Sequence, residues 1–303
     1  MYNRCRAIRI WLRDYSLFAP KGDDFFIYMA DGKMLHGGLA DRLYGMLNAY
    51  AFCKIKNIAF RINFIYPFDL QLFLKPNKYD WTIKKERISY NFVHSSVMVK
   101  IQEYGWHKKN INNKQIHFYC NTKNIDKINS YHDCNFSYHD LFNELFNPSE
   151  SLQAELDDMI NDVLKKTYIA FHFRFKNSLG DFKEASYPEL PDDKKIKLLD
   201  LCFKSIVPFI KSGKKVFLTS DSKLFLDNMI KRSDEIYFIP GDTIIMDYKV
   251  PFAVYKKAFL DFFILGNASK ILSARGDGLF ESGFSLFASQ ILNTEFQIIS
   301  VDE

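Results

Sequence analysis

The stretch Tyr-Ile-Ala-Phe-His-Phe at residues 168–173 decides the fold, because an almost wholly apolar run of this length is typical of a strand buried on both faces. Working outward from it, a helical pattern covers 192–211, between Pro191 and Gly213, as helix start and stop signals require. Further strands and helices follow in alternation, at 215–219, 222–231, 235–239, 252–265, 270–273, 282–292 and 296–299. This alternation predicts a doubly wound parallel sheet, which binds ligands at the carboxyl ends of its strands.

A second unit of the same kind opens the chain. An apolar strand at 25–30 leads through a glycine-containing turn into a helical pattern whose apolar residues recur between 39 and 50. A strand at 58–62 follows. This order of strand, loop, helix and strand indicates the beginning of another parallel sheet.

The sequence between these two units is less regular. Residues 75–148 are rich in aromatic and amide side chains, and only a strand at 116–119 can be placed among them, while a helix is expected at 151–165. We therefore predict an α/β protein of two Rossmann-like domains, 1–164 and 165–303, that face a central cleft.

The composition is that of an ordinary globular protein. Of 303 residues, 48% are apolar and 25% charged, and no apolar run approaches the roughly 18 residues of a membrane-spanning helix. Five scattered cysteines without a CxxC pair indicate free thiols in a reducing cytoplasm. The net charge of +5 suits an anionic ligand or a membrane surface and is too small for a dedicated nucleic-acid binder. We expect a cytoplasmic protein without a signal peptide or a nucleic-acid partner.

The first candidate site is the glycine turn before the N-terminal helix. Gly37 and Gly38 let backbone amides approach a ligand closely, and the helix N-terminus adds a positive dipole. Arg42 lies one turn into this helix, from where it can reach a bound anion. An ordinary tight turn with a surface arginine is the alternative.

The second candidate site is the end of the strand at 168–173. His172 and Arg174 alternate there, so their side chains share one face, and a charge at that place needs an anionic partner. The guanidinium fork suits a diphosphate, and a structural salt bridge to a neighbouring carboxylate is the alternative. Asp221 ends the next strand and reaches the same edge, although helix capping explains Asp221 or Ser222 equally well.

The third candidate site is the glycine-spaced loop and helix start at 275–288. Free amides and the hydroxyls of Ser282 and Ser285 would hold a phosphate without a metal, with Gly283 and Phe284 between them. Simple N-capping by Ser282 is the alternative.

Several other chemistries lack their motif in this chain. No D-x-D triplet, G-x-x-x-x-G-K loop or G-x-S-x-G elbow is present. The irregular region holds several histidines and cysteines whose spacing fits no zinc pattern, so we expect polar surface histidines and no metal. These residues are His94, His107, His117, His132 and His139, with Cys120 and Cys134.

Taken together, the three motifs resemble those of the fucosyltransferase superfamily that uses GDP-fucose, which includes α-1,2- and α-1,6-fucosyltransferases, the rhizobial nodulation enzyme and protein O-fucosyltransferases. Residues 37–42 resemble its Gly-Gly-Leu-(Gly/Ala)-(Asn/Asp)-(Gln/Arg) loop, 172–174 followed by Gly180 and Asp181 its H-x-R motif, and 282–288 its (Ser/Thr)-x-Phe-Ser-x-x-Ala segment. The resemblance implies a GT-B fold and inverting, metal-independent transfer of fucose, without a cofactor, to a glycan or lipid-linked glycan, expected here to be a bacterial surface polysaccharide.

The resemblance also implies roles for particular residues. Arg174 would hold the β-phosphate and neutralise charge on departing GDP, and Ser285 with the amides around Phe284 would bind the same diphosphate. His172 and Asp261 match positions that contact the nucleotide.

Other positions depart from the family pattern or are less certain in role. Arg42 and Gly38 would face the donor from across the cleft. Some members have a second arginine where Phe175 stands here, which leaves Lys176 or Arg42 to supply the second cation. The base has no aligned partner, and Asp181 and Glu184 are the nearby candidates.

Three questions stay open at the level of the sequence. The donor is GDP-fucose or another GDP- or UDP-sugar, and a non-catalytic glycan-binding component of a polysaccharide cluster is a further alternative. The acceptor and the linkage are not specified by any motif. The basic start of the chain forms an amphipathic surface helix or touches the inner membrane, through Arg4, Arg6, Arg9 and Arg13.

Overall fold

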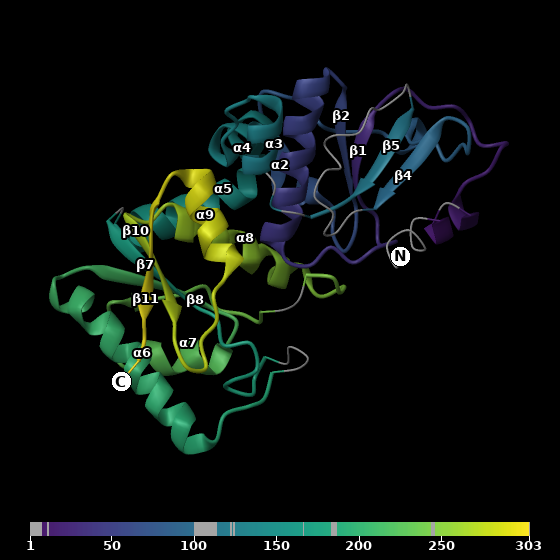
Figure 1. The fold of residues 1–303 in the computed structure, drawn as a ribbon. Coiled ribbons are helices and arrows are strands. Elements are labelled where there is room, and N and C mark those ends of the chain that lie inside the picture. The colour runs from purple at the N-terminus through teal and green to yellow at the C-terminus, as the bar shows by residue number, and fades with distance from the viewer. Residues whose placement is uncertain are drawn as a thin grey trace. The chain divides into compact units, whose positions relative to one another are not determined.

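The computed structural model describes residues 8–10, 12–99, 114–121, 123, 125–165, 167–182, 187–243 and 246–302. The chain divides into two compact units (Figure 1). Unit 1 comprises Met1–Ser149 and Met246–Lys249, and unit 2 comprises Glu150–Ile245 and Val250–Glu303. This division precedes the expected one between residues 164 and 165, because the helix that begins at Glu150 packs within unit 2.

Unit 1 is built on a parallel sheet that, in the described residues, has the strand order β2-β1-β5-β4. Its strands are β1 (Phe26–Ala30), β2 (Phe60–Phe64), β4 (Ser95–Val99) and β5 (Gln115–Tyr119). Side chains of β1 alternate between the two faces of the sheet: Ile27 and Met29 join one apolar cluster, whereas Phe26 contacts Phe52 of the long helix α2 (Leu39–Lys56). The central strand is therefore buried on both faces.

Helix α2 is buried along most of its length, because other helices of unit 1 cover it. α3 (Ile125–His132) and α4 (Tyr138–Leu145) both pack against it. Shorter elements complete the unit: the 3₁₀ turns η1 (Leu70–Leu72) and η2 (Lys85–Arg87), and the antiparallel pair β3 (Leu74–Pro76) and β6 (Phe146–Pro148). Residues 8–10 and 12–14 are helical, and Arg13 there pairs with the neighbouring Asp14.

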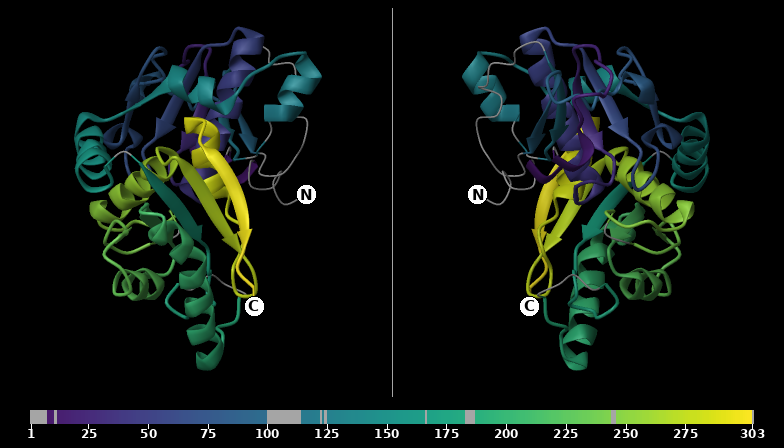
Figure 2. Two further views of the ribbon diagram at one scale, coloured as in Figure 1. Left: turned by 90° about the vertical axis from the view of Figure 1, so that its left-hand side faces the viewer. Right: turned by 90° about the vertical axis from the view of Figure 1, so that its right-hand side faces the viewer.

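Unit 2 is the doubly wound parallel sheet that the sequence predicts, and its strand order is β11-β10-β7-β8-β9. The first strand of the unit is thus central, and later strands are added on both sides of it. The strands are β7 (Tyr168–Phe173), β8 (Lys215–Ser220), β9 (Ile236–Tyr237), β10 (Lys270–Arg275) and β11 (Glu295–Ser300). Figure 2 shows β11, in yellow, beside β10 at the edge of this sheet.

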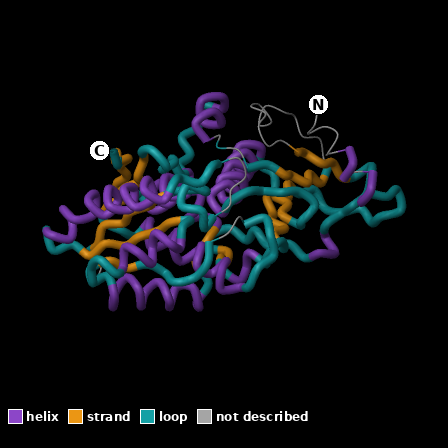
Figure 3. The backbone as a smooth tube through the Cα atoms, turned by 90° about the horizontal axis from the view of Figure 1, so that it is seen from below, coloured by secondary structure: helices purple, strands orange, loops and turns teal. Residues whose placement is uncertain are grey.

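Helices cover both faces of the unit 2 sheet (Figure 3). α6 (Asp192–Lys211) and α7 (Lys223–Ile230) share one apolar cluster with Phe171 and Phe173 of β7. α8 (Phe252–Gly266) and α9 (Gly283–Leu292) pack together on the other face. Before β7, α5 (Glu150–Asp157) continues as the π-helix η4 (Asp158–Val163) and contacts α8.

The α/β fold class and the paired Rossmann-like units are confirmed, and the arrangement of the two around a cleft stays a prediction. Sequence reasoning placed the strands and helices of unit 2 within about two residues, but within 75–148 it found only β5. None of the helices in the described part of the chain is long and apolar enough to cross a membrane. Cys53, Cys120, Cys134 and Cys202 are free thiols, as the sequence suggests.

Candidate functional site

His172 lies near the carboxyl end of β7 and faces α8 and α9, because it alternates with Phe171 and Phe173, which face α6 and α7. Its Nδ1 lies 2.7 Å from Thr219 Oγ1, and this hydroxyl donates to the Phe171 carbonyl. Thr219 therefore accepts the Nδ1 proton, and Nε2 carries the lone pair. Within the described structure Nε2 is buried and has no hydrogen-bond partner, and burial lowers the pKa of His172 to about 3, with Arg174 and Lys257 adding to the effect.

Asp261 is also buried and lies on α8, the helix whose Lys257 is near enough to His172 to lower its pKa. Its Oδ2 accepts a hydrogen bond from Lys257 Nζ at 2.5 Å, one helical turn away. Its Oδ1 has no partner among the described residues. Burial raises the pKa of Asp261, and the Lys257 ammonium opposes that shift. The positive charge of Lys257 therefore lowers the pKa of both Asp261 and His172.

The start of α9 completes this group. The Phe284 ring lies 5.8 Å from the His172 ring and 5.3 Å from the Phe262 ring. Ser282 is the N-cap, since its Oγ accepts the Phe284 amide, and the fully buried Ser285 hydroxyl donates to Ser273 Oγ at 3.1 Å. The structure thus brings His172, Asp261, Phe284 and Ser285 together, with Gly283 in the first turn of the helix.

Arg174 follows β7 and forms the salt bridge that was the alternative to a ligand. Its Nη1 lies 3.2 Å from Asp221 Oδ2, and the guanidinium side chain stays 26% exposed. The Asp221 carboxylate also accepts the amides of Phe175 and Lys176, so it holds the chain after β7 and orients the guanidinium. Burial raises the pKa of Asp221, and the positive charge of Arg174 opposes this shift. Asp221 thus positions Arg174, while Ser222 caps α7.

The remaining candidates near Arg174 have structural partners. The Lys176 ammonium lies over the rings of Tyr187 and Phe280, at 3.6 and 4.2 Å from their centroids. Asp181 accepts hydrogen bonds from the Leu224 amide and the Ser222 hydroxyl at the start of α7. Glu184 lies outside the described residues.

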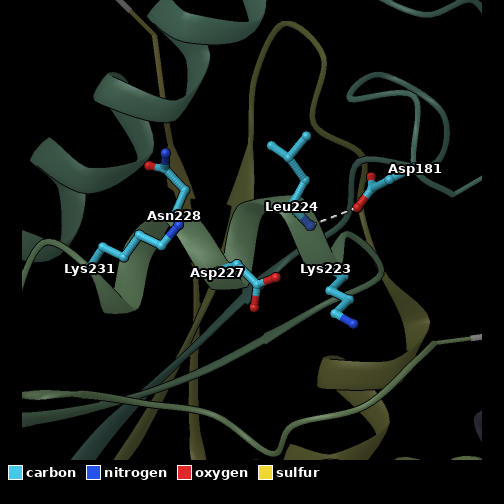
Figure 4. Close-up of a pocket in the computed structure, with 6 residues that line it drawn as sticks. All are labelled: Asp181, Lys223, Leu224, Asp227, Asn228 and Lys231. Atoms are coloured by element: carbon cyan, nitrogen blue, oxygen red, sulfur yellow. Dashed lines mark hydrogen bonds between the residues drawn. The ribbon is translucent and has the colours of Figure 1, made fainter.

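Figure 4 shows that Asp181 borders a surface hollow on α7, with its carboxylate turned to the Leu224 amide. Lys223 and Asp227 of α7, with Lys231 just after the helix, supply the hollow with charges of both signs. None of the residues of the His172 group lines it. Asp181 Oδ2 therefore accepts hydrogen bonds at the start of α7.

In unit 1 a carboxylate of the chain itself, that of Asp247, occupies the predicted anion site. Arg42 is buried, with 1% of its side chain exposed, and its Nη2 lies 2.7 Å from Asp247 Oδ1. The same carboxylate accepts the amides of His36 at 2.8 Å and Gly37 at 2.9 Å. The Gly38 amide donates to Asp41, which lies in the first turn of α2.

Three backbone carbonyls accept the other hydrogen bonds of the Arg42 guanidinium, those of Gly37, Tyr66 and Met246. Arg42 is therefore neither a surface arginine nor a cation that is open to the donor. We assign Arg42, Gly37 and their amide neighbours to holding the segment Met246–Lys249 within unit 1.

The expectation of surface histidines is wrong for His117. This side chain is wholly buried on β5, where Tyr15 contacts its Nδ1 and Gln115 Oε1 lies 2.9 Å from its Nε2. His107 lies outside the described residues. In the part of the chain that is described, no three histidine, cysteine, aspartate or glutamate side chains form a group able to hold a metal ion.

Several residues of the site were missed by sequence reasoning. Asp247 and Asn121 contact the first motif from distant parts of the chain, and no local pattern marks them. Lys257 did carry a signal: a lysine and an aspartate at i and i+4 in a mostly apolar helix indicate a buried ion pair.

The fold defines the class of protein as a two-unit GT-B-like α/β protein. No protein-family model matches the chain, and no match was found among curated proteins. Solved structures do match: the fucosyltransferase NodZ from Bradyrhizobium is 14% identical, with a TM-score of 0.56 over 90% of this chain and 93% of that one. NodZ α-1,6-fucosyltransferase soaked with GDP-fucose matches at 13% identity and a TM-score of 0.54, over 89% and 93% of the two chains. At this identity the likeness shows a shared fold.

Proposed function

We propose that the protein transfers fucose from GDP-fucose to a hydroxyl of a glycan acceptor. The observation that carries this proposal is the buried group in unit 2, where His172 Nε2 and Asp261 Oδ1 are acceptors without a partner among the described residues. An unsatisfied buried acceptor costs roughly 1–3 kcal/mol, so two in one neighbourhood favour a ligand that donates O–H or N–H groups. A guanosine offers both, from its ribose and its base. The fold shared with NodZ, which was soaked with GDP-fucose, supports this choice.

The diphosphate would be bound by charge and by the start of α9. Arg174 lies just past the carboxyl end of β7, where Asp221 orients it, and α9 begins beside His172. Helix N-termini and guanidinium groups both stabilise phosphate oxygens. We assign Arg174 to the leaving group, where a fixed cation stabilises charge that develops in the transition state.

The reaction would be a single displacement. The acceptor oxygen forms a bond to the anomeric carbon as the bond from that carbon to the diphosphate oxygen breaks, and the electron pair leaves with GDP. Attack from the face opposite the leaving group inverts the configuration, and the hydroxyl proton passes to a base. Arg174 and the dipole of α9 supply the positive charge, so the mechanism requires no divalent cation.

The acceptor we propose is a glycan or lipid-linked glycan on the way to a bacterial surface polysaccharide. Such an acceptor places the protein in the cytoplasm, with peripheral contact at the inner membrane when the acceptor is lipid-linked. The net charge of +5 is compatible with that contact.

Calorimetric titration of the protein with GDP and with UDP, in the presence of a chelator, tests the donor site. GDP should bind more tightly than UDP, and the chelator should not abolish binding. Tighter binding of UDP would assign a different donor sugar. Binding of oligosaccharide without either nucleotide would replace the proposal with a non-catalytic glycan-binding component.

Substitution of Arg174 tests catalysis. Arg174→Ala should lower the fucose transfer rate roughly 10²–10³-fold while the fold survives, the loss expected when one transition-state donor is removed. Arg232→Ala is the matched control, because Arg232 is an exposed arginine of unit 2 whose partner, Asp200, lies 2.8 Å away on the surface. Full activity of Arg174→Ala would contradict the assignment.

A further inference from the structure

The outer layer of unit 1 consists of residues 8–10 and 12–18 and covers one face of its sheet (Figure 1, purple helix beside the label N). Ile10 and Tyr15 of this layer are buried in the apolar cluster that contains Ile27 of β1. Helix α2 packs on the opposite face of β1. The outer layer therefore belongs to unit 1 alone and contains none of the residues proposed to bind the donor.

The outward side of the outer layer carries four large apolar side chains. Ile8 and Leu12 are more than half exposed and lie one helical turn apart. Leu17, also more than half exposed, and Phe18 follow in the next turn of the chain. Phe18 is 97% exposed, so its ring projects from the surface. Single exposed apolar residues are common, but a group of four in so short a segment indicates an interaction surface.

Hydrogen bonds hold the turn that carries Leu17 and Phe18. The Asn91 side-chain amide donates to the carbonyls of Leu17, at 3.2 Å, and Ala19, at 2.7 Å. Ser16 forms a parallel β-bridge with Asn91, and its hydroxyl accepts the Phe18 amide at 3.1 Å. The two apolar side chains are thus presented on an ordered backbone, which lowers the conformational entropy that binding would cost.

The charges of the outer layer are mainly positive. Arg9 is exposed, and so is most of the Arg13 side chain. Asp14 is the only carboxylate between residues 8 and 18, and it already pairs with Arg13 at 3.0 Å and with Lys33 at 3.3 Å. Two arginines against one aspartate leave the segment with a net charge of +1. The layer is therefore complementary to an anionic surface.

We propose that the outer layer is a membrane-binding surface: its four apolar side chains enter the boundary between headgroups and acyl chains of an anionic bilayer, and its two arginines contact lipid phosphates. Apolar side chains bordered by arginines are typical of segments that lie in a membrane interface. A fluid acyl layer also buries a projecting ring such as Phe18 without a matching pocket. Arg4 and Arg6 lie outside the described residues, and the proposal does not depend on them.

The inference rests on the proposed function in one respect, because a lipid-linked glycan would be met at the same membrane. It names the part of unit 1 that makes the peripheral contact, and it requires no particular placement of the two units. Binding to vesicles and transfer of fucose can be measured separately, so the two proposals can fail independently.

Co-sedimentation with vesicles of phosphatidylethanolamine and phosphatidylglycerol tests the apolar side chains. The wild-type protein should bind these vesicles. Leu17→Ser and Phe18→Ser together should weaken binding roughly tenfold or more, because two side chains that enter the bilayer are removed. Ile196→Ser is the matched control, since Ile196 of α6 in unit 2 is almost as exposed as Leu17, and this variant should bind like wild type.

A second pair of substitutions tests the arginines. Arg9→Gln and Arg13→Gln together should weaken binding to the same vesicles by roughly tenfold, because each cation near an anionic surface adds to the attraction. Vesicles of phosphatidylcholine alone should bind the wild-type protein more weakly, and added salt should weaken binding to the anionic vesicles.

The variants should keep the GDP affinity of wild type, which shows that they remain folded. Vesicle binding by Leu17→Ser/Phe18→Ser that equals that of wild type overturns the inference. So does a wild-type protein that ignores both kinds of vesicle, including one whose self-association depends on Phe18, since the surface would then join two copies of the chain. Fucose transfer to a soluble glycan without vesicle binding contradicts the inference alone, whereas vesicle binding without any transfer contradicts the proposed function.

Discussion

Arg42 of unit 1 and Arg174 of unit 2 were predicted to serve the same anion, but the structure surrounds them differently. Arg42 is 1% exposed and bonds to a carboxylate and three carbonyls of its own unit, whereas Arg174 is 26% exposed beside Asp221. A buried arginine that bonds to a carboxylate and to carbonyls of its own unit holds the chain together, whereas a partly exposed, oriented one is able to meet a ligand. The same residue type next to the same kind of motif thus serves structure in one unit and the candidate site in the other.

The largest effect on stability is expected for Asp247, because its carboxylate pairs with the buried Arg42. Asp247→Ala should lower the free energy of unfolding by about 3–5 kcal/mol, since it leaves the Arg42 guanidinium buried without its carboxylate. Urea denaturation measures this loss. Lys249→Ala in the same segment removes only a contact with the Tyr66 ring and should change stability by about 0.5 kcal/mol or less. Equal stability of the Asp247→Ala and wild-type proteins would show that Arg42 does not depend on this partner.

A second test uses the buried histidines of both units. Burial lowers the pKa of His36 to about 4 and that of His172 to about 3, below the unfolded value of 6.5. The unfolded chain therefore binds more protons below pH 6.5, and stability falls as the pH drops from 6.5 toward 4, by roughly 1 kcal/mol per pH unit for each histidine.

Urea midpoints at pH 7.5 and pH 5 measure this dependence, to which the buried His117 contributes in the same direction. His172→Gln should make the urea midpoint depend less steeply on pH, because it removes one of the groups that take up a proton only on unfolding. An unchanged midpoint between the two pH values would contradict the lowered pKa values, because the folded and unfolded chains would then bind equally many protons.

A smaller loss of stability than that of Asp247→Ala is expected at Arg174. Arg174→Ala should cost about 1–2 kcal/mol, less than Asp247→Ala, because Asp221 keeps its hydrogen bonds from the amides of Phe175 and Lys176. The same urea measurement ranks the two variants. A reversed order would remove the distinction between a structural and a ligand-facing arginine.

Local signals explain why unit 2 was predictable. Pro191 and Gly213 bracket a helix whose predicted limits match α6, and the unbroken apolar run of β7 identifies a central parallel strand. In unit 1, β4 is only partly buried, and residues 100–114 separate it from its partner strand β5. Such a strand has neither a clean alternation nor a continuous apolar run to mark it.

The candidate site shows the same limit of sequence reasoning. The motifs identified His172 and Arg174, but the residues that fix their state, Thr219 and Asp221, come from the neighbouring strand β8 and its end. For Arg42 the decisive partner lies more than two hundred positions later. A pattern within one segment predicts which side chains lie at the edge of a sheet. It does not predict which of them are already bonded to other parts of the chain.

The return of the chain to unit 1 at Met246–Lys249 has a consequence for biosynthesis. A ribosome releases the first 149 residues long before it translates Asp247, so Arg42 has no carboxylate from this segment during most of elongation. The salt bridge of Arg42 therefore forms only after Met246–Lys249 has been synthesised. A fragment that ends at residue 149 would contain this guanidinium without the Asp247 carboxylate.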